Sequence, residues 1–79
     1  MEREEILAQV QEIFRDLLDK EEVVVVDETN AEDIEEWDSL FHIQLIDAIQ
    51  KQFNIKFTAK EMLSWDNVGE LIECIKGKI

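Results

Sequence analysis

Apolar residues recur at the spacing of a helix face in three segments of the chain, whereas only one short segment has the composition of a strand. Residues 2–18 carry apolar side chains three or four positions apart, and this spacing returns after Ser39 and again over residues 68–75. The one β-branched run, Val23–Val26, has no second strand to pair with. The pattern predicts an all-α fold in which this run is an extended loop with one or two valines packed inward.

The second helix is expected to begin directly after Asp38. An aspartate is a favoured N-cap, because its carboxylate accepts a backbone N–H that the helix leaves free, and Ser39 then takes the first helical position. Ile34 is expected to anchor the preceding long loop in the core. The buried stripe of this helix is predicted to contain Leu40, Ile43, Leu45 or Ile46, Ile49 and Phe53.

Two further capping signals complete the architecture. The segment Thr58–Glu61 matches a capping box, which predicts a short third helix. Asn67 with Glu70 predicts the start of the last helix, and Gly77 is expected to be the C′ residue after its end. The expected fold is a small four-helix bundle with three main helices, one short third helix, and a long loop between the first and second helices.

The net charge of −12 lies entirely in the first half of the chain. Residues 1–38 contain 15 acidic and 3 basic residues, whereas residues 39–79 contain 5 of each. The segment Glu21–Asp38 carries nine acids and no base, so it is either a solvated loop or a docking surface that attracts basic partners. Binding to nucleic acid or to an anionic membrane surface is not expected, because phosphate contacts need clustered cations.

Length and composition exclude several other classes of protein. The 79 residues, 46% of them apolar, fit one domain over residues 1–79. No apolar run reaches about 18 residues and no secretory leader is recognisable, so neither membrane insertion nor export is expected. Cys74 has no cysteine to pair with, which fits the cytoplasm. The acids of Asp27–Asp33 do not match a calcium loop, so no metal site is expected. One histidine and no glycine-rich loop leave little with which to build a catalytic site, so the chain is not expected to be an enzyme.

Ser39 is the residue best placed for chemistry. At the first position of a helix it lies beside free backbone N–H groups and the positive end of the helix dipole, which favours a phosphate ester by about 0.3–1 kcal/mol at an exposed site. Asp38 would repel that phosphate, so a divalent cation would help during its transfer. A catalytic pair with His42 is not indicated, because nothing in the sequence places a base beside the hydroxyl. The position suits covalent modification by another protein.

The segment Asp33–Phe57 resembles the phosphopantetheine-attachment segment of acyl carrier proteins, and the resemblance extends over nearly the whole chain. The matching residues are Asp38-Ser39-Leu40, Ile43, Leu45, Ile46, Ile49, Phe53, Ile55 and Phe57. The resemblance implies that Ser39 carries a 4′-phosphopantetheine arm derived from coenzyme A, with Asp38 assisting attachment and Leu40 completing the motif. The arm would hold an acyl group as a thioester and deliver it between enzymes of lipid or specialised acyl metabolism.

The resemblance also implies partners and a cargo site. The expected partners of a monomeric carrier are a holo-carrier synthase, a loading ligase and downstream acyltransferases with basic surfaces. Residues expected to contact them are Glu35, Glu36, Asp47 and a partly exposed Phe41. An apolar acyl chain would lie among residues that ordinary core packing also explains, namely Leu45, Ile46, Ile49, Met62, Leu63 and Ile72.

Two alternatives stay open at this point. The Trp37-Asp38-Ser39-Leu40 form with His42 looks more like D-alanyl carriers and stand-alone carriers of specialised pathways, so the cargo is either acyl or aminoacyl. The second alternative is an acidic helical adaptor that binds basic proteins without a prosthetic group. Trp37 and Trp65 are interpreted as loop anchors rather than contacts for cargo.

Overall fold

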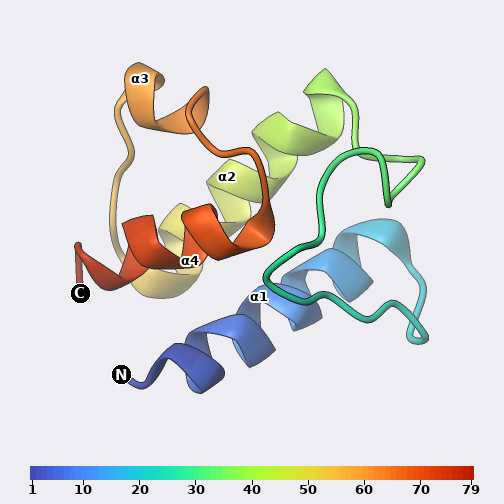
Figure 1. Cartoon of the computed structure of the whole chain (residues 1–79), viewed down its shortest axis with the longest axis horizontal. Coiled ribbons are helices and arrows are strands. Elements are labelled where there is room, and N and C mark those ends of the chain that lie inside the picture. The colour runs from blue at the N-terminus through green and yellow to red at the C-terminus, as the bar shows by residue number, and fades with distance from the viewer.

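Four helices make up the regular structure of the chain, as the sequence pattern predicted. The computed structural model describes all of residues 1–79 and contains no strand. Helix α1 spans Arg3–Leu18, α2 spans Ser39–Phe53, α3 spans Ala59–Met62 and α4 spans Val68–Lys76 (Figure 1). A long loop joins α1 to α2, and all four predicted helix starts lie within one residue of those observed.

The three long helices enclose one hydrophobic core. Helix α1 packs against both α2 and α4, whereas α3 contributes no fully buried side chain. Burying one large aliphatic or aromatic side chain stabilises a fold by about 1.5–3 kcal/mol. The largest side chains that are wholly enclosed are Phe14, Ile6, Leu45, Ile49, Leu71, Ile72, Ile75, Val10 and Val68.

The helix ends differ from the predicted pattern at Gly77. This residue follows α4 as expected, but its backbone is right-handed (φ −69°), and its N–H continues the helix by donating to Glu73 O at 3.1 Å. The left-handed helix ends lie instead at Asp19 and Asn54, each with φ 55°. Asparagine and aspartate tolerate this conformation better than most residues with a side chain.

The long loop is fastened along α1 in its first half. Arg15 Nε donates to Val23 O at 2.7 Å, and Gln11 Oε1 accepts from Val25 N at 2.9 Å. Val25 is buried and Val24 is exposed, so the extended run packs part of its apolar surface inward as predicted. Ile34, further along the loop, is also buried in the core.

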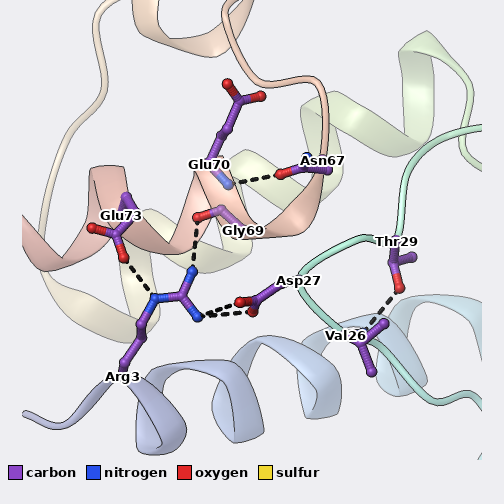
Figure 2. Close-up of polar contacts among 8 residues, drawn as sticks. All are labelled: Arg3, Val26, Asp27, Thr29, Asn67, Gly69, Glu70 and Glu73. Atoms are coloured by element: carbon purple, nitrogen blue, oxygen red, sulfur yellow. Dashed lines mark hydrogen bonds and ion pairs between the residues drawn. The ribbon is translucent and has the colours of Figure 1, made fainter.

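Arg3 fastens the middle of the loop to both α1 and α4 (Figure 2). Its Nη1 donates to both carboxylate oxygens of Asp27 at 2.8 and 2.7 Å, Nε donates to Glu73 at 2.6 Å, and Nη2 donates to Gly69 O at 3.3 Å. The hydrogen bonds that Arg3 donates to Asp27 and Glu73 raise the pKa of Arg3 above its ordinary value. We call these four residues the Arg3 clamp.

Backbone hydrogen bonds reinforce the Arg3 clamp. Gly69 N donates to Asp27 O and Val68 N donates to Thr29 O, both at 2.8 Å. The loop approaches α4 so closely that a Cβ on Gly69 would lie 3.2 Å from Asp27 O. The loop therefore reaches the start of α4 before it turns to α2 (Figure 1).

Candidate functional site

Ser39 is the first residue of α2, directly after the N-cap residue Asp38. Asp38 is the N-cap, and its Oδ1 accepts from Phe41 N at 2.9 Å while its carbonyl accepts from His42 N at 2.9 Å. The backbone N–H groups of Ser39 and Leu40 have no acceptor within the chain. The exposed Ser39 side chain thus lies beside two free donors at the positive end of a 15-residue helix.

A surface depression of about 370 Å³ adjoins Ser39. Its walls combine aromatic rings with two carboxylates from segments that are distant in sequence: the end of the long loop, the start of α2 and the turn before α4. The lining residues are Ala31, Trp37, Asp38, Ser39, His42, Trp65 and Asp66. We call this the aromatic depression.

The rings of the aromatic depression are continuous with the core. Trp37 meets Phe14 edge-on with ring centroids 5.3 Å apart, and it stacks on His42 at 6.1 Å. Trp65 lies edge-on to His42 at 5.9 Å and to Phe57 at 4.8 Å. Because Phe14 and Phe57 are buried, the tryptophan rings that line the depression pack directly on the hydrophobic core.

His42 holds two of these segments together through its ring nitrogens. Trp37 Nε1 donates to Nδ1 at 3.1 Å, which makes Nδ1 the acceptor nitrogen. The ring proton is therefore on Nε2, which donates to Met62 O at 2.9 Å. His42 thus ties the end of the loop to α3, and both of its ring nitrogens are engaged by partners other than Ser39.

The start of α2 buries a different face from the one predicted. Phe41 was expected to be partly exposed, but it is only 5% exposed and packs against Phe14 at 5.5 Å and Trp37 at 6.3 Å. Leu40 and Ile43 were expected in the buried stripe, but they are 65% and 64% exposed. The prediction was wrong because Phe41 completes an aromatic cluster with residues of α1 and the loop.

The acidic residues predicted to meet partners are not all free. Lys20 forms an ion pair with Glu36, and its hydrogen bond holds the pKa of Glu36 below the ordinary value. Asp47 points outward as expected but pairs with Lys51 at 3.1 Å, one helical turn away. Glu35 is exposed and has no ion pair. The outer face of α2 therefore presents little uncompensated charge.

The residues predicted to line an acyl site occupy three different environments. Leu45, Ile49 and Ile72 are fully buried and Ile46 nearly so, whereas Met62 is half-buried. Leu63 was expected inside the bundle, but it is 85% exposed, because it follows the short α3 and its side chain leaves the core. None of the six lines the aromatic depression.

Sequence reasoning named Trp37, His42 and Trp65 separately but did not bring them together. The two tryptophans do anchor loops, as interpreted, since both pack against the core. They also face one depression, and the only available signal was that both precede an aspartate near a helix start. Asp66 was missed entirely as a residue near Ser39.

Comparison with known proteins identifies the family. Residues 8–75 match the family model described as "Phosphopantetheine attachment site". A solved structure of holo acyl carrier protein from Geobacter metallireducens superposes with a TM-score of 0.86 at 37% sequence identity, covering 92% of this chain and 84% of that chain. No similar sequence was found among curated proteins.

The chain belongs to the phosphopantetheine-attachment family and has the acyl carrier protein fold. It is a carrier with a covalent 4′-phosphopantetheine group and is not itself a catalyst. The structure fits this group, because the Ser39 hydroxyl is exposed and the two N–H groups beside it are free for a phosphate. Such a carrier works with a synthase and with enzymes that use its cargo. None of its helices is long and apolar enough to cross a membrane.

Proposed function

We propose that Ser39 is the residue to which the 4′-phosphopantetheine arm is attached. The observation that carries this assignment is the exposed hydroxyl at the first position of α2, beside the free N–H groups of Ser39 and Leu40. When bound, the arm supplies a terminal thiol that holds an acyl group as a thioester. Asp38 uses one carboxylate oxygen to cap α2, which leaves the other for a divalent cation during attachment.

Intact-mass measurement tests the assignment. We expect incubation with coenzyme A and a broad-specificity holo-carrier synthase to add the mass of one phosphopantetheine. Ser39→Ala should abolish this addition. Ser64→Ala is the matched control and should leave the addition unchanged, because the Ser64 hydroxyl donates to Glu61 O at 2.8 Å after α3 and lies outside the motif.

The mass experiment also has outcomes that would contradict the assignment of Ser39. If the wild-type chain gains no mass from the synthase, or if Ser39→Ala gains as much as wild type, the assignment of Ser39 is wrong.

The surface around Ser39 supports a docking site for the synthase, the loading ligase and downstream acyltransferases. Leu40 and Ile43 project from α2 into solvent, and Glu35 in the loop before α2 is exposed and has no ion pair. Asp47 and Glu36 contribute less, because each is paired within the chain. We propose that partners contact the exposed Leu40 and Ile43 of α2 together with the acidic segment Glu21–Asp38 that leads into this helix.

The cargo is either an apolar acyl chain or a short aminoacyl group, and the two make different demands on the core. An apolar acyl chain would have to insert among Leu45, Ile46, Ile49, Met62 and Ile72, all but one of which are buried in the hydrophobic core. A short aminoacyl group such as D-alanine needs no such opening. Loading the arm with an octanoyl group should shift the NMR methyl signals of these residues, and loading it with D-alanine should not.

We propose that residues 1–79 form one monomeric carrier domain that works in the cytoplasm, where coenzyme A is available for attachment of the arm. The free Cys74 thiol is compatible with a reducing compartment. Sedimentation of the holo protein at a mass above that of one chain would contradict the monomer.

A further inference from the structure

We propose that the extended run Val23–Val26 is an edge to which a basic segment of a partner protein adds as a strand. We call this run the valine edge, and it lies where the loop runs back along α1 (Figure 1). The inference deepens the docking surface proposed for the acidic loop, and it rests on that proposal in taking the loop to face partner proteins. The valine edge itself needs neither Ser39 nor the arm.

The valine edge has the alternation of a strand. Val23 is half-buried, Val25 is buried, and Val24 and Val26 are exposed. In an extended backbone the N–H and C=O groups of successive residues also point to opposite sides. Val23 O and Val25 N each form a hydrogen bond with a side chain of α1. The backbone groups of Val24 therefore point away from α1.

The backbone of Val24 has no partner within the chain. Neither its N–H nor its C=O forms a hydrogen bond, whereas Val26 bonds to Thr29 through both of its groups (Figure 2). An unpaired edge of extended backbone is a template on which another chain can pair. Val24 offers the one donor and one acceptor that a residue of an antiparallel neighbour exchanges, so pairing would be centred on this residue.

A second surface depression, of about 430 Å³, lies at the end of the valine edge and indicates the chemistry of the partner. Its lining combines two apolar side chains with members of the Arg3 clamp and two further acids, namely Leu7, Val26, Arg3, Asp27, Glu4 and Glu28. Glu4 and Glu28 are exposed and form no ion pair. A lysine or arginine side chain fits this lining, because its stem covers apolar surface while its charged end stays among carboxylates.

The charge around the valine edge favours a basic partner over a second copy of the chain. Glu21 and Glu22 directly precede the run, are exposed and form no ion pair. The basic residues of this half of the chain are all paired internally, namely Arg3, Arg15 and Lys20. Two copies pairing through the same edge would bring like charges together, which opposes self-association. An extended segment with a basic residue at alternate positions would bring opposite charges together instead.

An NMR titration of the holo protein with a short synthetic peptide tests the valine edge. The peptide alternates lysine with valine and is blocked at both ends, and its matched control has the same side chains on an N-methylated backbone that cannot pair as a strand. At low salt we expect the first peptide to slow solvent exchange of the Val24 amide about fivefold at saturation. The Val25 amide already donates to Gln11 and should change little. The N-methylated peptide should leave the exchange of Val24 unchanged.

Substitutions separate backbone pairing from attraction by charge. Val24→Pro removes an N–H that no group of the chain accepts, so the fold should persist while peptide binding is lost. Val24→Thr keeps the N–H and the branched shape and should bind as wild type does. Glu28→Gln should weaken binding about two- to fivefold. Asp16→Asn is its matched control, because Asp16 is an exposed acid of α1 outside the depression, and it should bind with the wild-type affinity.

Three results would overturn the valine edge. Equal binding of the N-methylated peptide would show attraction by charge alone, and wild-type binding by Val24→Pro would show that the backbone is not used. No binding of the lysine peptide would leave the acids as protection of the edge against self-pairing. Apo and holo protein should bind the peptide equally. A failure of the arm to attach therefore leaves the valine edge standing, and a loss of peptide binding leaves the attachment at Ser39 standing.

Discussion

The long loop between α1 and α2 is held at two places by different kinds of interaction. In its middle, the Arg3 clamp joins Asp27 to α1 and α4 through ion pairs and hydrogen bonds that are largely open to solvent (Figure 2). At its end, Trp37 is inserted between Phe14, Phe41 and His42. The first attachment is polar and directional, whereas the second depends mainly on buried apolar area.

The two attachments of the loop differ in whether they also form the surface beside Ser39. No residue of the Arg3 clamp lines the aromatic depression, but Trp37 and His42 both do. A partly exposed ion pair contributes modestly and is screened by salt. The aromatic attachment therefore carries most of the stabilisation and also shapes the surface beside Ser39. The following substitutions test this division.

The largest effect is expected from removing the ring on which Trp37 packs. Phe14 is fully buried and contacts both Trp37 and Phe41, so Phe14→Ala should destabilise the fold by about 3–5 kcal/mol. Because that is comparable with the whole stability of a small domain, Phe14→Leu, with an expected loss of about 1–2 kcal/mol, is measured alongside by urea unfolding. A loss below about 0.5 kcal/mol for Phe14→Ala would contradict the aromatic attachment as the stronger one.

The next effect tests how closely the loop approaches α4. A Cβ on Gly69 would lie 3.2 Å from both Asp27 O and Asn67 Oδ1, so Gly69→Ala should cost about 1–3 kcal/mol by forcing the loop away. Gly77→Ala is the matched control, since its nearest neighbours lie at 3.6 Å and its φ is −69°. Equal urea midpoints for the two variants would show that the loop yields without strain.

Local signals in the sequence predicted the helix starts, and long-range packing decided the rest. Asp38, Thr58 and Asn67 all cap helices as predicted, because a cap depends on the next three residues only. The prediction of the buried face of α2 was wrong. The start of that helix has apolar residues on more than one side, and packing against Phe14 buries Phe41 in place of Leu40 and Ile43. For the site, the local capping signal at Asp38 correctly predicted that Ser39 begins α2.

The rest of the polar framework had no local signal. Arg3 meets Asp27, Gly69 and Glu73 across 24 to 70 positions of sequence. Trp65 and Asp66 reach the depression beside Ser39 only because α4 folds back against α1 and the loop. Sequence periodicity gives the faces of helices but not which distant side chains meet between them.

Breaking the Arg3 clamp should lower stability without changing the site. Arg3→Met removes the donors to Asp27, Glu73 and Gly69 O, so we expect a fall of a few degrees in melting temperature. Arg3→Lys keeps the charge but loses the forked geometry of the guanidinium, so its melting temperature should lie between those of wild type and Arg3→Met. In both variants the indole N–H resonances and the attachment of the arm should match wild type. A displaced Trp37 resonance in Arg3→Met would contradict the independence of the two attachments.

A smaller, pH-dependent effect is expected at Glu61. Its hydrogen bond from Thr58 N and its contact with Lys78 hold the pKa of Glu61 below the ordinary value. A lowered pKa in the folded state stabilises the fold above the unfolded-state pKa, and this stabilisation disappears as pH falls through the folded-state value. The difference in melting temperature between wild type and Glu61→Gln should therefore be present at neutral pH and vanish in acid. Lys78→Met removes only the contact with Lys78, so its melting temperature at neutral pH should differ less from wild type than that of Glu61→Gln does. If the difference between wild type and Glu61→Gln grows in acid, the lowered pKa of Glu61 is contradicted.

The smallest effect is expected from salt, and it distinguishes the two attachments directly. Added salt screens the repulsion among the 15 acids of residues 1–38, which should raise the melting temperature, but it also weakens the Arg3 clamp. Arg3→Met has no clamp to lose, so its melting temperature should rise more steeply with NaCl than that of wild type. Trp37→Phe changes only the aromatic attachment and should rise with the wild-type slope. Parallel slopes for Arg3→Met and wild type would mean that the clamp contributes no screened electrostatic stabilisation, and its role would then reduce to the geometry of the backbone bonds at Gly69.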